Sequence, residues 1–212
     1  MKVLMLTGVA LGLLAGCHGE DHEIGSPSGT TGPLEFRETF SGEFPGEDWI
    51  VEEGDPAVVM ADEGNDGPGL VFGPSLDDVH VETAFTFTTT EALNLSLDLA
   101  SPPQVEPEPS LFRFQIVGEG ITVETASADV TPAEGIIRLS ILGESETVIF
   151  PTNGEFHRIA FAVDEFGIAT WFVDGLPAMT RTSFPEGSFR LELEARAETA
   201  TGFVVDNVVL SR

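Results

Sequence analysis

Glu192 and Glu194 are the acidic residues whose type and spacing come nearest to a working carboxylate pair. In an extended strand they project from one face roughly 7 Å apart, and paired carboxylates serve as acid and nucleophile or base in glycoside hydrolysis. Arg190 and Arg196 alternate onto the same face, however, and neighbouring guanidinium groups keep carboxylates ionised instead of leaving one protonated as an acid. The pattern predicts a solvated, salt-bridged strand face.

Other groups that could carry out chemistry are sparse. The sequence contains no G-x-S-x-G nucleophile elbow, and its single cysteine is Cys17. Beyond residue 32 the only histidines are His80 and His157, which stand far apart in the chain. These features predict no catalytic residues and a protein that is not an enzyme.

Two acidic clusters could attract metal ions. Residues 62–67 place oxygen ligands between glycines, but Gly73 stands where an EF-hand needs its bidentate glutamate, so the segment is not an EF-hand. We expect structural calcium at Asp62 and Asp66, the one candidate cofactor. Residues 18–23 carry two histidines and three acidic residues, but nothing preorganises them, so we expect a solvated spacer there.

The N-terminus is typical of an export signal. Residues 3–14 are an apolar run that is too short to span a bilayer as a helix and has the length of a signal-peptide core. The run ends in Leu14-Ala15-Gly16-Cys17, which resembles the lipobox of bacterial lipoproteins. The resemblance implies a signal peptide over residues 1–16 and a palmitoylated Cys17 that anchors the protein to a membrane.

Residues 17–32 predict a flexible tether after the signal peptide. They are polar, rich in Gly, Ser and Thr, and offer almost nothing to bury. His18 stands where some bacteria use an aspartate to retain lipoproteins in the inner membrane, so the resemblance favours the outer membrane. We therefore expect a lipid-anchored protein of the bacterial cell envelope.

The net charge of −27, from 36 Asp+Glu against 9 Lys+Arg in 212 residues, limits the partners. Nucleic acids and anionic membrane surfaces are polyanions that this surface repels. Cations, basic proteins and neutral glycans remain. The hydrophobic fraction of 42% suffices for a core, so the acidity does not mark a disordered tail.

From residue 33 onward, hydrophobic side chains recur with a period of two. Clear examples are residues 79–87, 93–99, 112–116, 137–141 and 189–193. This alternation is typical of antiparallel strands with one buried face and one solvent-facing side. The sequence predicts an all-β domain over residues 33–212, folded as a two-sheet antiparallel jelly-roll sandwich.

Four stretches resemble concanavalin A-like and laminin-G-like domains. They are the opening segment 40–45 with Trp49, the paired segments 156–164 and 168–175, and the last strand 203–210 with its Asp-Asn-Val sequence. The galactose-binding-like jelly roll ends in a similar strand and remains the alternative fold. The resemblance implies loops that often carry calcium.

In glycosidases of the concanavalin A-like group, one strand carries E-x-D-x-E or E-x-D-x-x-E. Glu53-Gly54-Asp55 begins that motif, but neither Ala57 nor Val58 supplies the closing glutamate. The same resemblance implies glycan binding across the polar face of a sheet. Trp171 lies on an apolar strand face, so we expect it in the core and not as a platform for a sugar.

Polar residues opposite the core of three strands form the candidate ligand site. They are Asn94, Asp98, Arg113, Gln115, Glu192 and Glu194. If the three strands are neighbours, these side chains tile one surface that can hydrogen-bond sugar hydroxyls. Changing Gln115 and Asp98 together to alanine would then weaken glycan binding and leave the melting temperature nearly unchanged.

These observations favour a lipid-anchored, non-catalytic envelope protein that binds glycan through a β-sandwich. One alternative is a structural or adhesion module that binds another envelope protein. The second alternative is a glycoside hydrolase or lyase. The oligomeric state has no signature in the sequence.

Overall fold

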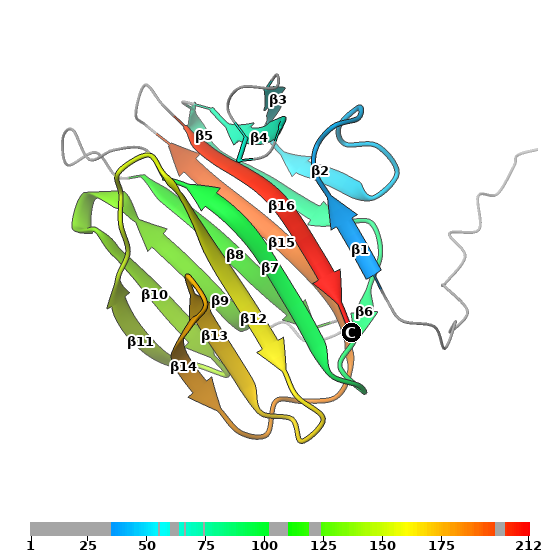
Figure 1. Ribbon diagram of the computed structural model, residues 1–212. Coiled ribbons are helices and arrows are strands. Elements are labelled where there is room, and N and C mark those ends of the chain that lie inside the picture. The colour runs from blue at the N-terminus through cyan, green and yellow to red at the C-terminus, as the bar shows by residue number, and fades with distance from the viewer. Residues whose placement is uncertain are drawn as a thin grey trace, which may run out of the picture. The chain divides into compact units, whose positions relative to one another are not determined.

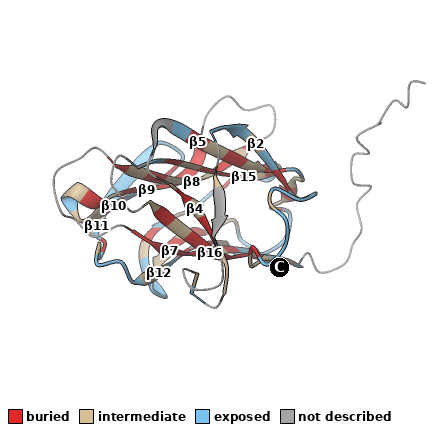
Figure 2. Cartoon of the chain, turned by 90° about the horizontal axis from the view of Figure 1, so that it is seen from above, coloured by how far each residue is buried: buried red, intermediate tan, exposed pale blue. Residues whose placement is uncertain are grey.

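Two antiparallel sheets face each other across a layer of hydrophobic side chains in the computed structural model (Figures 1 and 2). The structure describes residues 35–54, 56–59, 64–65, 67–73, 75–101, 110–118, 124–197 and 202–212. The expected signal peptide, Cys17 and the tether lie outside these residues, as do Asp62 and Asp66. Those expectations stay predictions.

Sheet A has eight strands and contains both ends of the described chain. Its spatial order is β14 (Leu176–Arg181), β13 (Ala169–Val173), β12 (Phe156–Val163), β7 (Leu93–Ala100), β16 (Phe203–Ser211), β4 (Gly69–Phe72) and β3 (Ala57–Val59). The first strand, β1 (Glu35–Glu38), also pairs with β16, the last strand. The first and last strands of the sandwich are thus neighbours (Figure 1).

Sheet B also has eight strands. Its spatial order is β11 (Glu144–Ile149), β10 (Ile136–Ile141), β9 (Glu124–Thr131), β8 (Leu111–Gly118), β15 (Ser188–Ala197), β5 (Ser75–Thr83) and β2 (Trp49–Glu53). The short β6 (Phe87–Thr88) pairs with one end of β15. Among the described residues, the one helical segment is a single 3-10 turn at Pro132–Glu134, so the predicted all-β sandwich is confirmed.

The inner faces of the two sheets interlock through aromatic rings. Phe114 of sheet B meets Trp171 of sheet A edge to face at 5.3 Å between ring centroids, and Phe112 lies 5.8 Å from Phe72. Trp171 is fully buried and its indole Nε1 donates to the carbonyl of Ser140 in sheet B at 2.9 Å. A buried aromatic ring adds a large hydrophobic contact area, and the partner of its N–H avoids the cost of burying a polar group. The placement of Trp171 in the core, predicted from the sequence, is confirmed.

The paired segments 156–164 and 168–175 form a hairpin of adjacent strands. β12 and β13 pair antiparallel, with Phe161 opposite Trp171. Asp174 and Gly175 both have positive φ, 50° and 77°, as the hairpin turn into β14 requires. Asp174 also accepts from His157 Nδ1 at 2.8 Å, and Asn153 Oδ1 lies 3.3 Å from Nε2. His157 therefore orders this turn.

No helix among the described residues is long and apolar enough to cross a membrane.

Candidate functional site

The outer side of sheet B carries a row of charged and polar side chains from four adjacent strands. β5, β15, β8 and β9 are neighbours, with Glu192 opposite Glu82 on one side and Gln115 on the other. Because alternate residues of each strand point away from the core, their polar positions come together on one surface. We call this surface the polar face of sheet B: His80, Glu82, Arg113, Gln115, Asp129, Arg190, Glu192 and Glu194.

One half of the polar face is centred on Arg113. Its guanidinium contacts both carboxylate oxygens of Asp129, at 2.9 and 3.2 Å, and reaches Glu194 Oε2 at 3.4 Å. Gln115 Nε2 donates to the same glutamate oxygen at 3.3 Å. The side chains of Arg113 and Glu194 are both 29% exposed, so this half of the face is ordered by its own contacts yet open to a ligand.

The other half holds a pair of glutamates from different strands. Arg190 Nε lies 2.9 Å from Glu82 Oε2 and 2.7 Å from Glu192 Oε1. His80 Nε2 lies 3.4 Å from the second oxygen of Glu192. Glu82, Glu192 and His80 each bring one side-chain atom within 4.8 Å of the others. We call these three residues with Arg190 the Glu82–Glu192 cluster.

The two glutamates of this cluster have pKa values shifted in opposite directions. Burial raises the pKa of Glu82 above its usual 4.5, and the nearby charges of Glu192 and Glu52 add to the rise that Arg190 opposes. The close approach of the His80 imidazole, 3.4 Å away, lowers the pKa of Glu192, and Arg190 lowers it further against the effect of burial. Carboxylates whose environments separate their pKa values are suited to act as an acid and an ionised nucleophile.

The Glu82–Glu192 cluster also has the side chains for a divalent cation. One imidazole and two carboxylates are ligands that zinc or manganese accepts. Arg190 already bridges the two carboxylates, however, and supplies the positive charge that a metal would bring. Of the arginine–glutamate pairs expected on β15, these contacts confirm Arg190–Glu192, and Arg190 also pairs with Glu82. Glu192 is buried, so the strand face is not solvated there as expected.

Asn94 and Asp98 lie elsewhere, which corrects the assumption that the three polar strands are neighbours. Both residues belong to β7 in sheet A, between β12 and β16, whereas β8 and β15 pair in sheet B. The alternation of polar and apolar residues shows which side of a strand is polar, but it does not show which strands are adjacent. The prediction that all six candidate residues share one surface was therefore wrong. Only Arg113, Gln115, Glu192 and Glu194 share it.

Asp98 is the centre of a buried hydrogen-bonded network. Its side chain is 4% exposed and accepts from Arg158 Nε and Nη2, at 2.8 and 3.0 Å. Asn65 Nδ2 and Asn207 Nδ2 each donate to Asp98 Oδ2 at 3.0 Å. Burial alone would raise the pKa of Asp98, but these hydrogen bonds outweigh it and hold the pKa below its usual 3.8. Asp98 therefore stabilises the fold instead of facing a ligand.

A bulge in β16 builds this network from the Asp-Asn-Val sequence. The pairing with β7 shifts register between Asp206 and Val209, and Asn207 has a positive φ of 49°. Both Asp206 and Asn207 are buried as a result, and Asp206 Oδ2 accepts the backbone N–H of Asn65 at 2.8 Å. The loop that contains Asn65 is thereby tied to the last strand.

His80, Glu82 and Asp129 belong to the polar face but not to the six residues that the sequence predicted for the ligand site. His80 and Glu82 are the two that join Glu192 in the cluster. They stand about 110 residues before Glu192, on a different strand. Their alternation with Val79 and Val81 did indicate that both side chains lie on the solvent-facing side of a strand. Periodicity could not show that this strand pairs with β15.

We predict that His80 makes stability depend on pH. The close contact with the Glu192 carboxylate raises the pKa of His80 above 6.5 against the effect of burial, and the charges of Glu194 and Glu82 add to the rise. Protonated His80 thus stabilises the fold fully below pH 6.5, and this contribution is lost as pH rises through the folded-state pKa. Urea unfolding from pH 5.5 to 8.5 should show a loss of about 1 kcal/mol.

His80→Gln should remove this pH dependence, and His157→Gln, which changes the histidine of the β12–β13 hairpin, should retain it. A parent protein whose stability rises between pH 6.5 and 8.5 relative to His80→Gln would contradict the prediction.

Comparison with known proteins gives the fold but no sequence family. No protein-family model matches the chain, and no curated protein matches it by sequence. The structure resembles the Emp47p carbohydrate recognition domain (TM-score 0.67, 11% identity, 87% of this chain and 99% of that one). It also resembles an endo-β-1,3-glucanase from Pyrococcus furiosus (TM-score 0.64, 14% identity, 83% and 92%). A third similar structure is the Crh5 transglycosylase (TM-score 0.62, 17% identity, 84% and 83%).

These neighbours confirm the concanavalin A-like jelly roll and correct one prediction. The chain was expected not to be an enzyme because it lacks a nucleophile elbow, a reactive cysteine, neighbouring histidines and a complete E-x-D-x-E strand. That exclusion is wrong, since the fold is shared with a transglycosylase and with glucanases from Pyrococcus furiosus and Bacillus licheniformis. The E-x-D-x-E motif places its carboxylates on one strand. Its absence therefore does not exclude carboxylates that come together from two strands, as those of Glu82 and Glu192 do.

Proposed function

We propose that the chain binds glycan across the polar face of sheet B. The observation that carries the proposal is the continuous row of hydrogen-bonding side chains on β5, β15 and β8, half of it open around Arg113, Gln115 and Glu194. Amide, guanidinium and carboxylate groups in such a row complement sugar hydroxyls. The net charge of −27 favours a neutral glycan over an anionic one.

The structural neighbours support this proposal. One similar structure is the carbohydrate recognition domain of Emp47p, and another is named as an endo-β-1,3-glucanase, an enzyme that acts on β-1,3-glucan. The first name suggests a carbohydrate ligand in general, and the second suggests β-1,3-glucan as the first ligand to try. A similar structure, the Crh5 transglycosylase in complex with NAG, adds N-acetylglucosamine oligomers.

The test is binding to immobilised β-1,3-gluco-oligosaccharides and N-acetylglucosamine oligomers. Changing Gln115 and Glu194 together to alanine should weaken binding tenfold or more, about 1.4 kcal/mol, with a nearly unchanged melting temperature. This pair replaces the earlier choice of Gln115 with Asp98, because Asp98 lies in the other sheet. Equal binding by the parent and the variant would contradict the proposal, as would capture of an envelope protein without binding to any glycan.

Glycoside hydrolysis or transfer is the second candidate function, and the Glu82–Glu192 cluster favours it. One oxygen of each carboxylate lies within 4.8 Å of one oxygen of the other, so the two groups are close enough to act on one glycosidic bond, as the paired carboxylates of retaining enzymes do. In such a reaction Glu82 would protonate the glycosidic oxygen while Glu192 attacks the anomeric carbon. Glu82 would then deprotonate water, or the hydroxyl of a second sugar, which displaces Glu192.

We also propose that Cys17 anchors the protein to the outer membrane through acyl chains. The support is the lipobox-like sequence, and Cys17 is outside the described residues. In a bacterial host, labelled palmitate should be incorporated into the parent and not into Cys17→Ser, which should lose its membrane attachment. Equal labelling of both would contradict the anchor.

We also propose calcium at Asp62 and Asp66, which stand on either side in sequence of Asn65, a residue in contact with Asp98 and Asp206. A similar structure, the Emp46p carbohydrate recognition domain, is a potassium-bound form, which suits a fold that accepts cations. Millimolar calcium should raise the melting temperature by several degrees relative to EDTA. Asp62→Asn with Asp66→Asn should abolish the rise, and superimposable melts of the parent would contradict it.

A further inference from the structure

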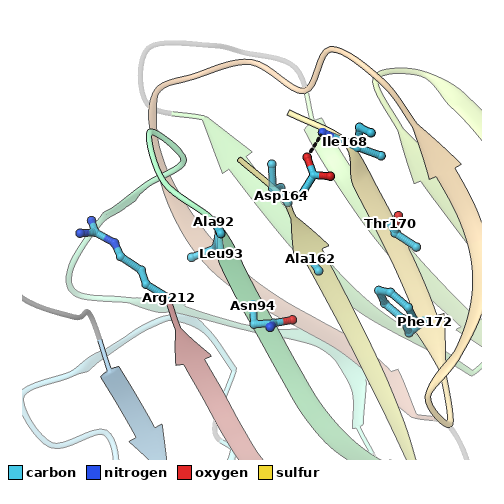
Figure 3. Close-up of a pocket in the computed structure, with 10 residues that line it drawn as sticks. Ala92, Leu93, Asn94, Ala162, Asp164, Ile168, Thr170, Phe172 and Arg212 are labelled. Atoms are coloured by element: carbon cyan, nitrogen blue, oxygen red, sulfur yellow. Dashed lines mark hydrogen bonds between the residues drawn. The ribbon is translucent and has the colours of Figure 1, made fainter. Parts of the chain in front are cut away.

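A hollow of about 340 Å³ lies on the outer side of sheet A, away from the polar face of sheet B (Figure 3). Three adjacent strands form its floor, because Ala162 of β12 pairs with Asn94 of β7 on one side and with Thr170 of β13 on the other. The small side chain of Ala162 leaves space between them. Phe172 closes one end, and Asp164, Ile168 and Arg212 form the rim (Figure 3).

The lining combines an aromatic ring with polar groups that are ready to bind. The amide of Asn94 is exposed and has no hydrogen-bond partner within the described part of the chain. Asp164 Oδ1 accepts the backbone N–H groups of Phe166 and Ile168, at 2.9 and 2.8 Å, and these two bonds fix the carboxylate at the rim. Phe172 is only partly buried, so its ring is accessible from the hollow.

The charges at the hollow exclude an anionic ligand. Arg212 is the one cation in the described lining, and it is already paired with Glu91 at 3.1 Å and with Thr88 at 3.0 Å. Asp164 adds a negative charge to the rim. A neutral molecule that offers both hydroxyl groups and an apolar face fits this lining.

We propose that this hollow is a second saccharide site that takes one neutral pyranose ring. The apolar face of the ring would stack on Phe172, and its hydroxyls would meet the Asn94 amide and the Asp164 carboxylate. The volume lies at the lower end of ligand sites, about 300–1,000 Å³, which suits one ring and not an extended chain. The inference rests on the proposed glycan function and extends it to both faces of the sandwich.

Saturation-transfer NMR with the full chain tests the proposal, using the methyl β-glycosides of glucose, galactose and N-acetylglucosamine. At least one should receive saturation from the parent. Phe172→Ala and Asn94→Ala should each reduce that transfer fivefold or more. Ala162→Phe, which fills the floor without removing a polar group, should do the same. Phe166→Ala is the matched control, since Phe166 is an exposed ring outside the hollow, and it should behave as the parent.

The same variants separate this inference from the function proposed for sheet B. The Gln115 and Glu194 double variant should keep the transfer to the methyl glycoside while losing affinity for the oligosaccharides. If no methyl glycoside receives saturation, or if the three hollow variants match the parent, the second site is overturned even where sheet B still binds oligosaccharides. If only the hollow variants lose binding, the second site stands and the sheet B proposal fails.

Discussion

Replacing Asp98 with alanine is expected to lower the free energy of unfolding by about 3 kcal/mol at pH 7. The change removes the acceptor of three side chains and leaves the Asn207 amide, which is buried, without its Asp98 partner. Arg158 is 55% exposed and can return to water, which limits the loss. Urea unfolding monitored by tryptophan fluorescence measures the change.

Asp129→Ala is the matched control for Asp98→Ala. Asp129 also pairs with an arginine, but its side chain is 20% exposed in sheet B, so the expected loss is under about 1 kcal/mol. Because the pKa of Asp98 is depressed, its contribution should persist above pH 3.8 and disappear as pH falls through the folded-state value. An Asp98→Ala protein as stable as the parent would show that the network does not stabilise the fold.

Glu82→Gln should reduce turnover of a β-glucan about a thousandfold if the chain hydrolyses or transfers glycosides. Glutamine keeps the shape of the side chain but cannot deliver the proton to the leaving oxygen. Release of reducing ends and formation of longer oligosaccharides from laminarin measure the two reactions. Since burial raises the pKa of Glu82, the parent should stay active above pH 4.5 and lose activity as Glu82 deprotonates on the alkaline side.

Glu134→Gln, an exposed change in the 3-10 turn, serves as the control and should leave turnover within twofold of the parent. If Glu82→Gln retains parental turnover, the Glu82–Glu192 cluster is not the catalytic machinery.

Local pattern predicted much of the fold because burial alternates along strands such as β8 and β10. Phe112 and Phe114 of β8, and Trp171 of β13, are buried as their period of two indicates. Asp174-Gly175 is a sequence typical of a hairpin turn, and both residues have the positive φ values that such a turn requires.

The site was only partly predictable because it depends on which distant strands pair. Glu192 was recognised, but its partner Glu82 comes from a strand more than 100 residues earlier in the chain. Asp98 was misassigned for the same reason: its side of β7 is polar in pattern, yet a bulge in β16 and the loop at Asn65 cover it. Burial of a polar residue by other segments leaves no periodic signal.

The most direct test of the glycan-binding proposal is a map of amide chemical shifts. The ¹⁵N-labelled protein is titrated with a β-1,3-linked glucose hexasaccharide and, separately, with an N-acetylglucosamine hexamer. We expect the largest shifts at residues 80–82, 113–115 and 190–194, where β5, β8 and β15 form the polar face of sheet B. Saturable shifts confined to residues outside these three strands would contradict the assignment of the site to sheet B.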